Sequence, residues 1–168
     1  MPRASVLASA LLFAVGCRVG GPARLTDRQR TAITDSVRQV AAALAGRVSE
    51  RGYRAFPAVM DSAPGYLWAY NGFIPFAAFD SMAAWARADG APRRPHVFAW
   101  DTLRVEALAP GLATLAATFV ETGTDSAGAT TTEKGVFTAV AVHRAEGWRF
   151  TNAHTSMLPP PSPAAVRR

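Results

Sequence analysis

The hydrophobic pattern of this chain changes its period part-way along the sequence, and that change restricts the folds open to it. Between residues 25 and 51, apolar side chains recur every three or four positions and would form one stripe on a helix: Ile33, Val37, Val40, Leu44 and Val48. Thr26 and Gln29 form a capping-box pattern at the start of this segment. From Pro95 onward the pattern has a period of two, which is typical of strands. The order predicts a long helix packed on an antiparallel sheet.

Shorter elements are expected between this helix and the strands. They are a short helix, a strand and a second helix, over residues 53–60, 66–70 and 79–88. Four strands follow, separated by turns and by a polar loop at 123–132; they are expected at 96–108, 112–122, 133–144 and 148–157. The third of these strands is apolar on both faces, so one face would meet the helices and the other a second subunit. We therefore predict an α+β fold, with helices on one face of a bent, mostly antiparallel sheet, and a homodimer.

Composition limits the chemistry that the chain can perform. The chain has 168 residues, of which 49% are hydrophobic, enough for one domain with its own core. A single cysteine excludes an internal disulfide and a cysteine-built zinc site, and the three histidines lack a metal-binding spacing, so no metal and no other cofactor is expected. The formal net charge is +6, but the arginines are scattered and form no basic stripe. Nucleic acid is therefore not an expected partner.

The N-terminus has the pattern of a bacterial export signal. A basic start, Met1–Arg3, precedes an apolar run from Ala4 to Val15, which is too short to span a bilayer. The run leads to Cys17, the only cysteine, and resembles the lipobox of bacterial lipoproteins, except that Ala14 stands where leucine is usual. The resemblance implies cleavage before Cys17 and acylation of that residue, which would anchor the protein at the bacterial cell envelope, facing the periplasm or the outside. The alternative is an ordinary secretion signal that leaves a free thiol.

The last predicted strand carries a short motif that points to a fold family. It reads Gly147-Trp148-Arg149-Phe150 and continues to His154-Thr155-Ser156. Together with the order of elements, this motif resembles the nuclear transport factor 2-like (NTF2-like) superfamily, and within it the SnoaL-like and DUF4440-type bacterial members. The resemblance implies a cone-shaped α+β fold whose bent sheet encloses a pocket, often with dimerisation through the sheet. With the export signal and the composition of the two ends, it divides the chain into a signal peptide (1–16), a tether (17–24), one domain (25–157) and a disordered proline-rich tail (158–168).

Three polar residues are candidates for acid–base chemistry. By strand parity, the imidazole of His154 shares a face with other residues of the last strand, namely Trp148, Phe150 and Asn152. It would reach the pocket if that face is concave. Asp61 and Tyr53 bracket the short helix, near where the superfamily often closes its pocket, and a desolvated aspartate there would act as a base. The alternatives are a structural histidine satisfied by a neighbouring strand, and an aspartate that caps a turn.

Aromatic residues are concentrated in the middle of the chain and supply most of the candidate ligand-binding set. These residues are expected to form the walls of an apolar cavity together with residues of the last two strands; the set is Trp68, Tyr70, Trp85, Trp100, Phe137, Trp148 and Asn152. Their hydroxyl and indole N–H groups would orient a ligand. The alternative is that these side chains only pack in the core.

Three functions are open for a chain with these features. The first is an envelope-anchored domain that binds a small apolar molecule or a protein partner. The second is a proton-transfer enzyme, an isomerase, cyclase, dehydratase or hydrolase, that uses His154 with Asp61 or Tyr53. The third is a dimerisation scaffold without a ligand. The resemblance does not decide among these functions, because the fold serves many of them. Ketosteroid isomerases of the superfamily use a catalytic Asp with a Tyr and a second acid, and limonene epoxide hydrolases use an Asp-Arg-Asp set. Neither catalytic set can be placed on this sequence.

Overall fold

The computed structural model describes residues 24–90, 96–124 and 127–159. Along the chain these residues form α1 (Asp27–Arg51), the 3₁₀ helix η1 (Gly52–Ala58), β1 (Trp68–Tyr70), β2 (Phe73–Phe76), α2 (Phe79–Asp89), β3 (His96–Ala109), β4 (Leu112–Thr124), β5 (Thr130–Arg144) and β6 (Gly147–Met157). The predicted signal peptide, the acylation site at Cys17 and nearly all of the predicted tether and tail lie outside the described residues. Among the residues that are described, no helix is long and apolar enough to cross a membrane.

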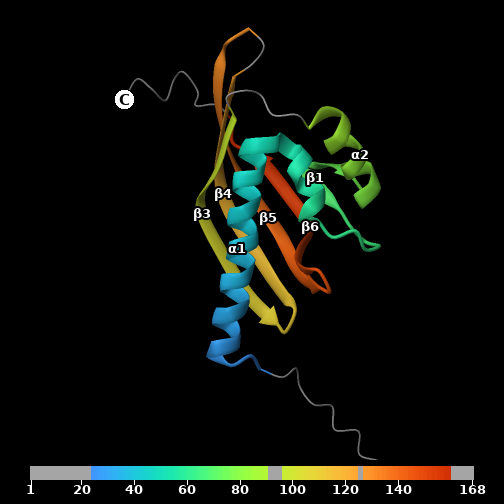
Figure 1. Cartoon of the computed structure of the whole chain (residues 1–168), viewed down its shortest axis with the longest axis vertical. Coiled ribbons are helices and arrows are strands. Elements are labelled where there is room, and N and C mark those ends of the chain that lie inside the picture. Colours follow the sequence, from blue (N-terminus) through green and yellow to red (C-terminus); the bar gives the residue numbers. More distant parts are fainter. Residues whose placement is uncertain (1–23, 91–95, 125–126, 160–168) are drawn as a thin grey trace, which may run out of the picture.

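The long helix α1 forms as its sequence predicts. The backbone N–H of Thr26 donates to Gln29 Oε1 at 2.9 Å, and the N–H of Gln29 donates to Thr26 Oγ1 at 3.3 Å, so the capping box is complete. The helix ends at Arg51 and is capped by Gly52, whose φ of +62° is a conformation that glycine adopts without steric cost. Its buried stripe, formed by Val37, Ala41, Leu44 and Val48, packs along β3 (Figure 1).

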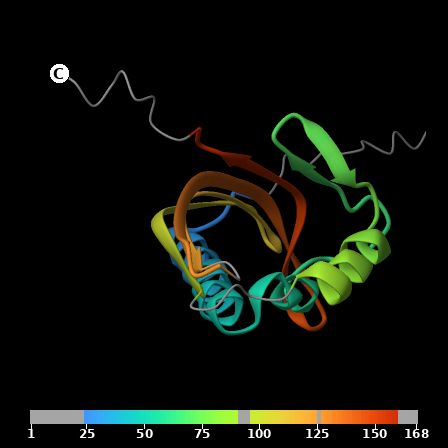
Figure 2. The ribbon, with the colours of Figure 1, turned by 90° about the horizontal axis from the view of Figure 1, so that it is seen from above.

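The six strands form one sheet in the order β2-β1-β6-β5-β4-β3. Every pair is antiparallel except β1 and β6, which run parallel with Trp68 opposite Ala153. Figure 2 shows the sheet bent like a trough, with α1, η1 and α2 on its open side. Register shifts in the β3–β4 and β5–β6 pairs mark bulges, which bend the strands on which they occur. The predicted α+β arrangement of helices on a bent, mostly antiparallel sheet is confirmed.

A bulge in β6 reverses which residues face the core. Val140 pairs with Thr151 and Thr138 pairs with His154, so β6 carries one more residue than β5 between these pairs. Asn152, with φ at +47°, is at the bulge. Before it, Trp148 and Phe150 are buried; after it, Ala153 and Thr155 are the buried residues. The prediction that His154 shares a face with Trp148 and Phe150 is therefore wrong, because strict alternation does not continue through a bulge.

Candidate functional site

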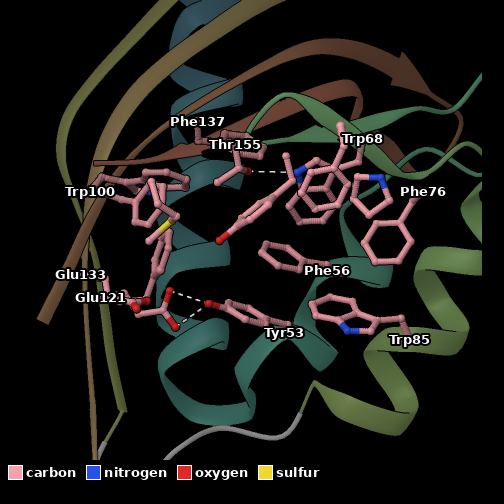
Figure 3. Close-up of a pocket in the computed structure, with 16 residues that line it drawn as sticks. Tyr53, Phe56, Trp68, Phe76, Trp85, Trp100, Glu121, Glu133, Phe137 and Thr155 are labelled. Atoms are coloured by element: carbon pink, nitrogen blue, oxygen red, sulfur yellow. Dashed lines mark hydrogen bonds between the residues drawn. The ribbon is translucent and has the colours of Figure 1, made fainter. Parts of the chain in front are cut away.

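A cavity of about 270 Å³ lies between the concave face of the six-stranded sheet and the helices η1 and α2 (Figure 3). Aromatic rings make up eleven of its sixteen lining residues, and they come from seven elements of the fold. The other five are Pro75, Glu121, Glu133, Thr155 and Met157. The cavity therefore has mostly apolar walls and a few polar groups, as small-molecule sites usually do.

The aromatic rings of the cavity are packed against one another in defined geometries. Tyr53 stacks on Phe56, with ring centres 5.4 Å apart and planes 11° apart, and also on Trp85 at 5.6 Å. Phe56 and Trp68 make an edge-to-face contact, with ring centres 4.8 Å apart and planes 83° apart. Stacked and edge-to-face contacts of this kind each contribute about 0.5–1.5 kcal/mol beyond the burial of area. These walls are consequently stiff.

Two indole N–H groups are already engaged by the protein. Trp68 Nε1 donates to Thr155 Oγ1 at 3.0 Å in a buried hydrogen bond, and Trp100 Nε1 donates to the carbonyl of Ala41 at 2.7 Å. The sequence predicts that indole N–H groups orient a ligand. These two instead fix the positions of their own rings.

The polar end of the cavity is built around Glu121. The hydroxyl of Tyr53 donates to its carboxylate at 2.7 Å from Oε1 and 2.6 Å from Oε2 (Figure 3). His96 Nε2 lies 2.8 Å from Glu121 Oε1, although His96 itself is not a lining residue. Glu133 is the cross-strand partner of Glu121 in the β4–β5 pair. Two carboxylates, a phenol and an imidazole therefore meet at one end of an aromatic cavity.

Burial and the nearby carboxylates perturb the two tyrosines of this end. Burial raises the pKa of the Tyr53 phenol, and the negative charge and hydrogen bond of Glu121 raise it further. Burial also raises the pKa of Tyr70, followed by the charges of Glu133 and Glu121. Tyr53 thus remains protonated at neutral pH and acts as a hydrogen-bond donor to Glu121.

The cavity gathers six of the ten cavity residues proposed from the sequence. These are Tyr53, Trp68, Tyr70, Trp85, Trp100 and Phe137. Trp148 is buried elsewhere in the core, with its ring edge-on to His143 at 5.2 Å. Asn152 lies on the outer face of the sheet, and His154 is hydrogen-bonded to Ser156 at 3.1 Å. Neither Asn152 nor His154 lines the cavity, because the bulge in β6 turns both away from it.

Asp61 also lies outside the cavity and has a clear structural partner. Its buried carboxylate accepts two hydrogen bonds from Arg144, Nη2 to Oδ2 at 2.6 Å and Nε to Oδ1 at 3.2 Å. It also accepts a hydrogen bond from the backbone N–H of Ala63 at 3.4 Å, as an aspartate that caps a turn does. These contacts, and above all the hydrogen bonds from Arg144, lower the pKa of Asp61. Asp61 and Tyr53 are therefore not brought together in one site.

Several site residues were not identified from the sequence, and Glu121 and Glu133 matter most among them. A signal was present, because Glu121 has the strand parity of Phe119 and Glu133 has that of Phe137. The β4–β5 register places the two glutamates opposite each other and aims both at the concave face. Within the described parts of the chain, no three His, Cys, Asp or Glu side chains are grouped closely enough to hold a metal ion.

A second, more open hollow of about 480 Å³ lies on the outer face of the sheet. It is formed by residues of β3, β4, β5 and β6, among them Arg104, Glu106, Thr138, Val140 and Asn152. Its larger volume does not make it the better small-molecule site, since it is a shallow groove on one sheet face with no cover of helices. Such a surface fits a flat partner better than a small ligand.

The chain matches no known family model and no curated protein, but many solved structures share its fold. One is an NTF-2-like protein of unknown function from Shewanella oneidensis MR-1, 16% identical, with 73% of this chain and 97% of that chain covered and a TM-score of 0.60. LinA is 13% identical over 77% of this chain and 88% of that chain, with a TM-score of 0.63. The association domain of CaMKII from C. elegans is 14% identical over 76% and 97% of the two chains, with a TM-score of 0.61. These likenesses confirm the predicted NTF2-like cone.

Proposed function

We propose that this protein binds a small, largely apolar molecule in the cavity enclosed by its bent sheet. The observation that carries the proposal is the cavity itself, with eleven aromatic rings around about 270 Å³ and hydrogen-bonding groups at one end. An engineered cavity of about 150 Å³ in another protein is large enough to bind benzene. The present cavity therefore has room for a molecule of about two fused rings.

The test uses 1-naphthalenemethanol, a neutral two-ring alcohol, as the probe in isothermal titration calorimetry. The variant Phe73→Ser removes a cavity ring that is 56% exposed, and Ile74→Ser changes the next residue of the same strand, which is 55% exposed and does not line the cavity. We expect Phe73→Ser to weaken binding about fivefold, since roughly 1 kcal/mol of apolar contact is lost, and Ile74→Ser to leave it unchanged. Absence of binding to the unaltered chain, or equal affinity of all three proteins, would refute the proposal.

A proton-transfer enzyme is the second candidate, favoured by one observation. Tyr53, Glu121 and His96 form a continuous hydrogen-bonded array that reaches the cavity. Such an array could take a proton from a bound molecule at Glu121, in place of the His154 and Asp61 predicted from the sequence. The test is hydrogen–deuterium exchange at the acidic C–H positions of 2-tetralone in D₂O, followed by NMR. Exchange that is faster than in buffer and lost in Glu121→Gln would support catalysis; exchange at the buffer rate would restrict the site to binding.

A lipid anchor at Cys17 remains part of the proposal. It is supported by the short apolar run that ends at Val15 and by the position of the only cysteine two residues later. In a bacterial host, the unaltered protein should fractionate with membranes, whereas Cys17→Ser should become soluble or be retained as an uncleaved precursor. Membrane attachment of Cys17→Ser in its cleaved, mature-sized form, at the level of the unaltered protein, would contradict acylation at Cys17.

A homodimer formed through the outer face of the sheet is also proposed. The hollow on that face offers a surface without a helix layer, and the C. elegans neighbour is an association domain. Val140→Lys would place a charge in this hollow, and Ile74→Lys would place one on β2, outside it. In sedimentation velocity we expect the first variant alone to be monomeric. A wild-type protein that is monomeric at high concentration would rule the dimer out.

A further inference from the structure

We infer that the ligand of the aromatic cavity is an organic cation, namely a protonated amine carried on a flat apolar body. The inference rests on the proposed binding function and adds the charge of the ligand to it. The cavity, and not the acidic pair alone, is the site: its walls fix the apolar body, and its polar end selects the charge.

The polar end of the cavity offers many more hydrogen-bond acceptors than donors. Glu121 and Glu133 face each other across the β4–β5 pair, and both line the cavity. The hydroxyl of Tyr53 is directed at Glu121, so it is not free to donate to a ligand. No arginine or lysine is among the described residues that line the cavity. Although the chain carries a formal charge of +6, this end of the cavity is therefore locally negative.

A buried histidine holds Glu121 in place from outside the cavity. The side chain of His96 is only 4% exposed, and its Nε2 lies 2.8 Å from Glu121 Oε1. Its Nδ1 is buried and has no hydrogen-bond partner among the described residues. Burying an imidazole with an unmet hydrogen-bonding group opposes folding, and its contact with the carboxylate offsets part of that cost. That contact and the one from Tyr53 fix the position of the Glu121 carboxylate in the cavity wall.

The aromatic walls favour the same ligand charge. The faces of Trp and Tyr rings carry a negative quadrupole, which attracts a cation within about 6 Å of the ring centre. Tyr53 presents such a ring next to Glu121, Trp85 stacks on Tyr53 on the side away from the carboxylates, and Trp100 lies on the same side of the cavity as the two glutamates (Figure 3). An anionic ligand would meet two carboxylates of like charge. A neutral apolar ligand would cover the carboxylates without replacing their water, which is costly.

The test compares two probes that differ only in the polar group. These are 1-naphthylmethylamine, which is protonated at neutral pH, and 1-naphthalenemethanol, which is neutral; both are titrated calorimetrically into the full chain at low salt. A charge-assisted hydrogen bond is worth more than a neutral one, so we expect the ammonium probe to bind at least about tenfold more tightly.

Three variants assign this preference to the cavity. Glu133→Gln removes one charge at an exposed position, and Glu121→Gln removes the other. Glu106→Gln is the matched control, since it removes the same charge from the outer face, where the side chain is 69% exposed. We expect each cavity variant to reduce the preference for the ammonium probe about threefold or more, and Glu106→Gln to leave it unchanged. If Glu121→Gln does not fold, Glu133→Gln decides.

The outcomes separate this inference from the proposed function. If neither probe binds, the binding function fails and the inference fails with it. If Phe73→Ser weakens binding of the alcohol, and the ammonium probe binds no more tightly than the alcohol, the binding function holds. Only the inference that the ligand is a cation is then overturned. It is also overturned if Glu106→Gln reduces the preference as much as Glu133→Gln does, because the attraction would then come from the overall charge of the protein.

Discussion

Gly135 is a position where the structure predicts a sharp effect of a single added methyl group. It lies in β5, opposite Phe119 of β4, whose ring lines the cavity. A Cβ atom built on Gly135 would overlap Cζ of that ring and lie 2.7 Å from its Cε1. It would also lie 2.8 Å from the carbonyl oxygen of Ser156. The aromatic ring can swing aside, but that carbonyl belongs to the β5–β6 ladder and cannot move alone.

The size of the effect follows from these distances. The carbonyl of Ser156 would have to retreat by about 0.6 Å to reach the 3.4 Å of an ordinary contact, and the ring by more. Overpacking of this kind costs about 1–3 kcal/mol. Gly135→Ala should therefore be destabilising. Gly46→Ala is the control, because Gly46 is exposed in the middle of α1 with nothing within 4 Å of the added Cβ, and alanine there should stabilise by about 0.5–1 kcal/mol.

The assay is urea unfolding followed by the fluorescence of the four tryptophans. With an m-value of about 2 kcal/mol per molar urea, a loss of about 2 kcal/mol lowers the midpoint by about 1 M. The same chemical change should thus lower the midpoint at Gly135 and raise it at Gly46. A midpoint for Gly135→Ala equal to or above that of the wild type would show that β5 and β6 are not packed as described.

Three further predictions concern stability. Thr155→Val should lower the free energy of unfolding by about 1–3 kcal/mol, because it leaves the buried N–H of Trp68 without its acceptor; an unchanged urea midpoint would mean that this indole finds another acceptor. Because Arg144 lowers the pKa of Asp61, their contact stabilises the fold above about pH 4, and this stabilisation is lost as pH falls through the folded pKa. The destabilisation by Arg144→Gln at pH 7 should therefore shrink near pH 3. Equal destabilisation at both pH values would contradict this role of the contact. Because the pKa of Tyr53 is raised in the folded protein, its contribution to stability is complete below about pH 10 and is lost progressively above that pH. Between about pH 8 and pH 11, Tyr53→Phe should therefore lose less stability than the wild type. Equal losses in the two proteins would argue against a raised pKa of Tyr53.

Much of the fold could be predicted because its main elements are set by local patterns. The stripe of α1 and its capping box depend only on residues within a few turns of one another. The polar loop predicted at 123–132 is shorter in the structure, because Thr122–Thr132 and Thr124–Thr130 hydroxyl pairs at 3.0 Å extend the β4–β5 ladder into it. The short edge strand β2 was not expected; it contains a proline and is mostly exposed, so it carries no alternating pattern.

The candidate site could be predicted only in part because two of its determinants are not local. The bulge at Asn152 inserts one residue and moves His154 to the outer face, and a period-two pattern cannot detect such an insertion. An asparagine is among the residues that tolerate a positive φ, which is the only hint that the sequence contains. The pairing of Glu121 with Glu133 depends on the register between two strands, and that register is set by the whole sheet.

The open cavity itself calls for a physical explanation, because eleven aromatic rings in water would normally close on one another. Three of them are held at their polar edges: Trp100 to Ala41 of α1, Trp68 to Thr155 of β6, and Tyr53 to Glu121 of β4. Each hydrogen bond ties a ring to a different element, so a ring that moved inward would leave a polar group unpaired at a cost of about 1–3 kcal/mol. Collapse would break several such bonds at once. The cavity is thus held open by the same contacts that stabilise the fold, and a ligand would meet walls that need no rearrangement to receive it.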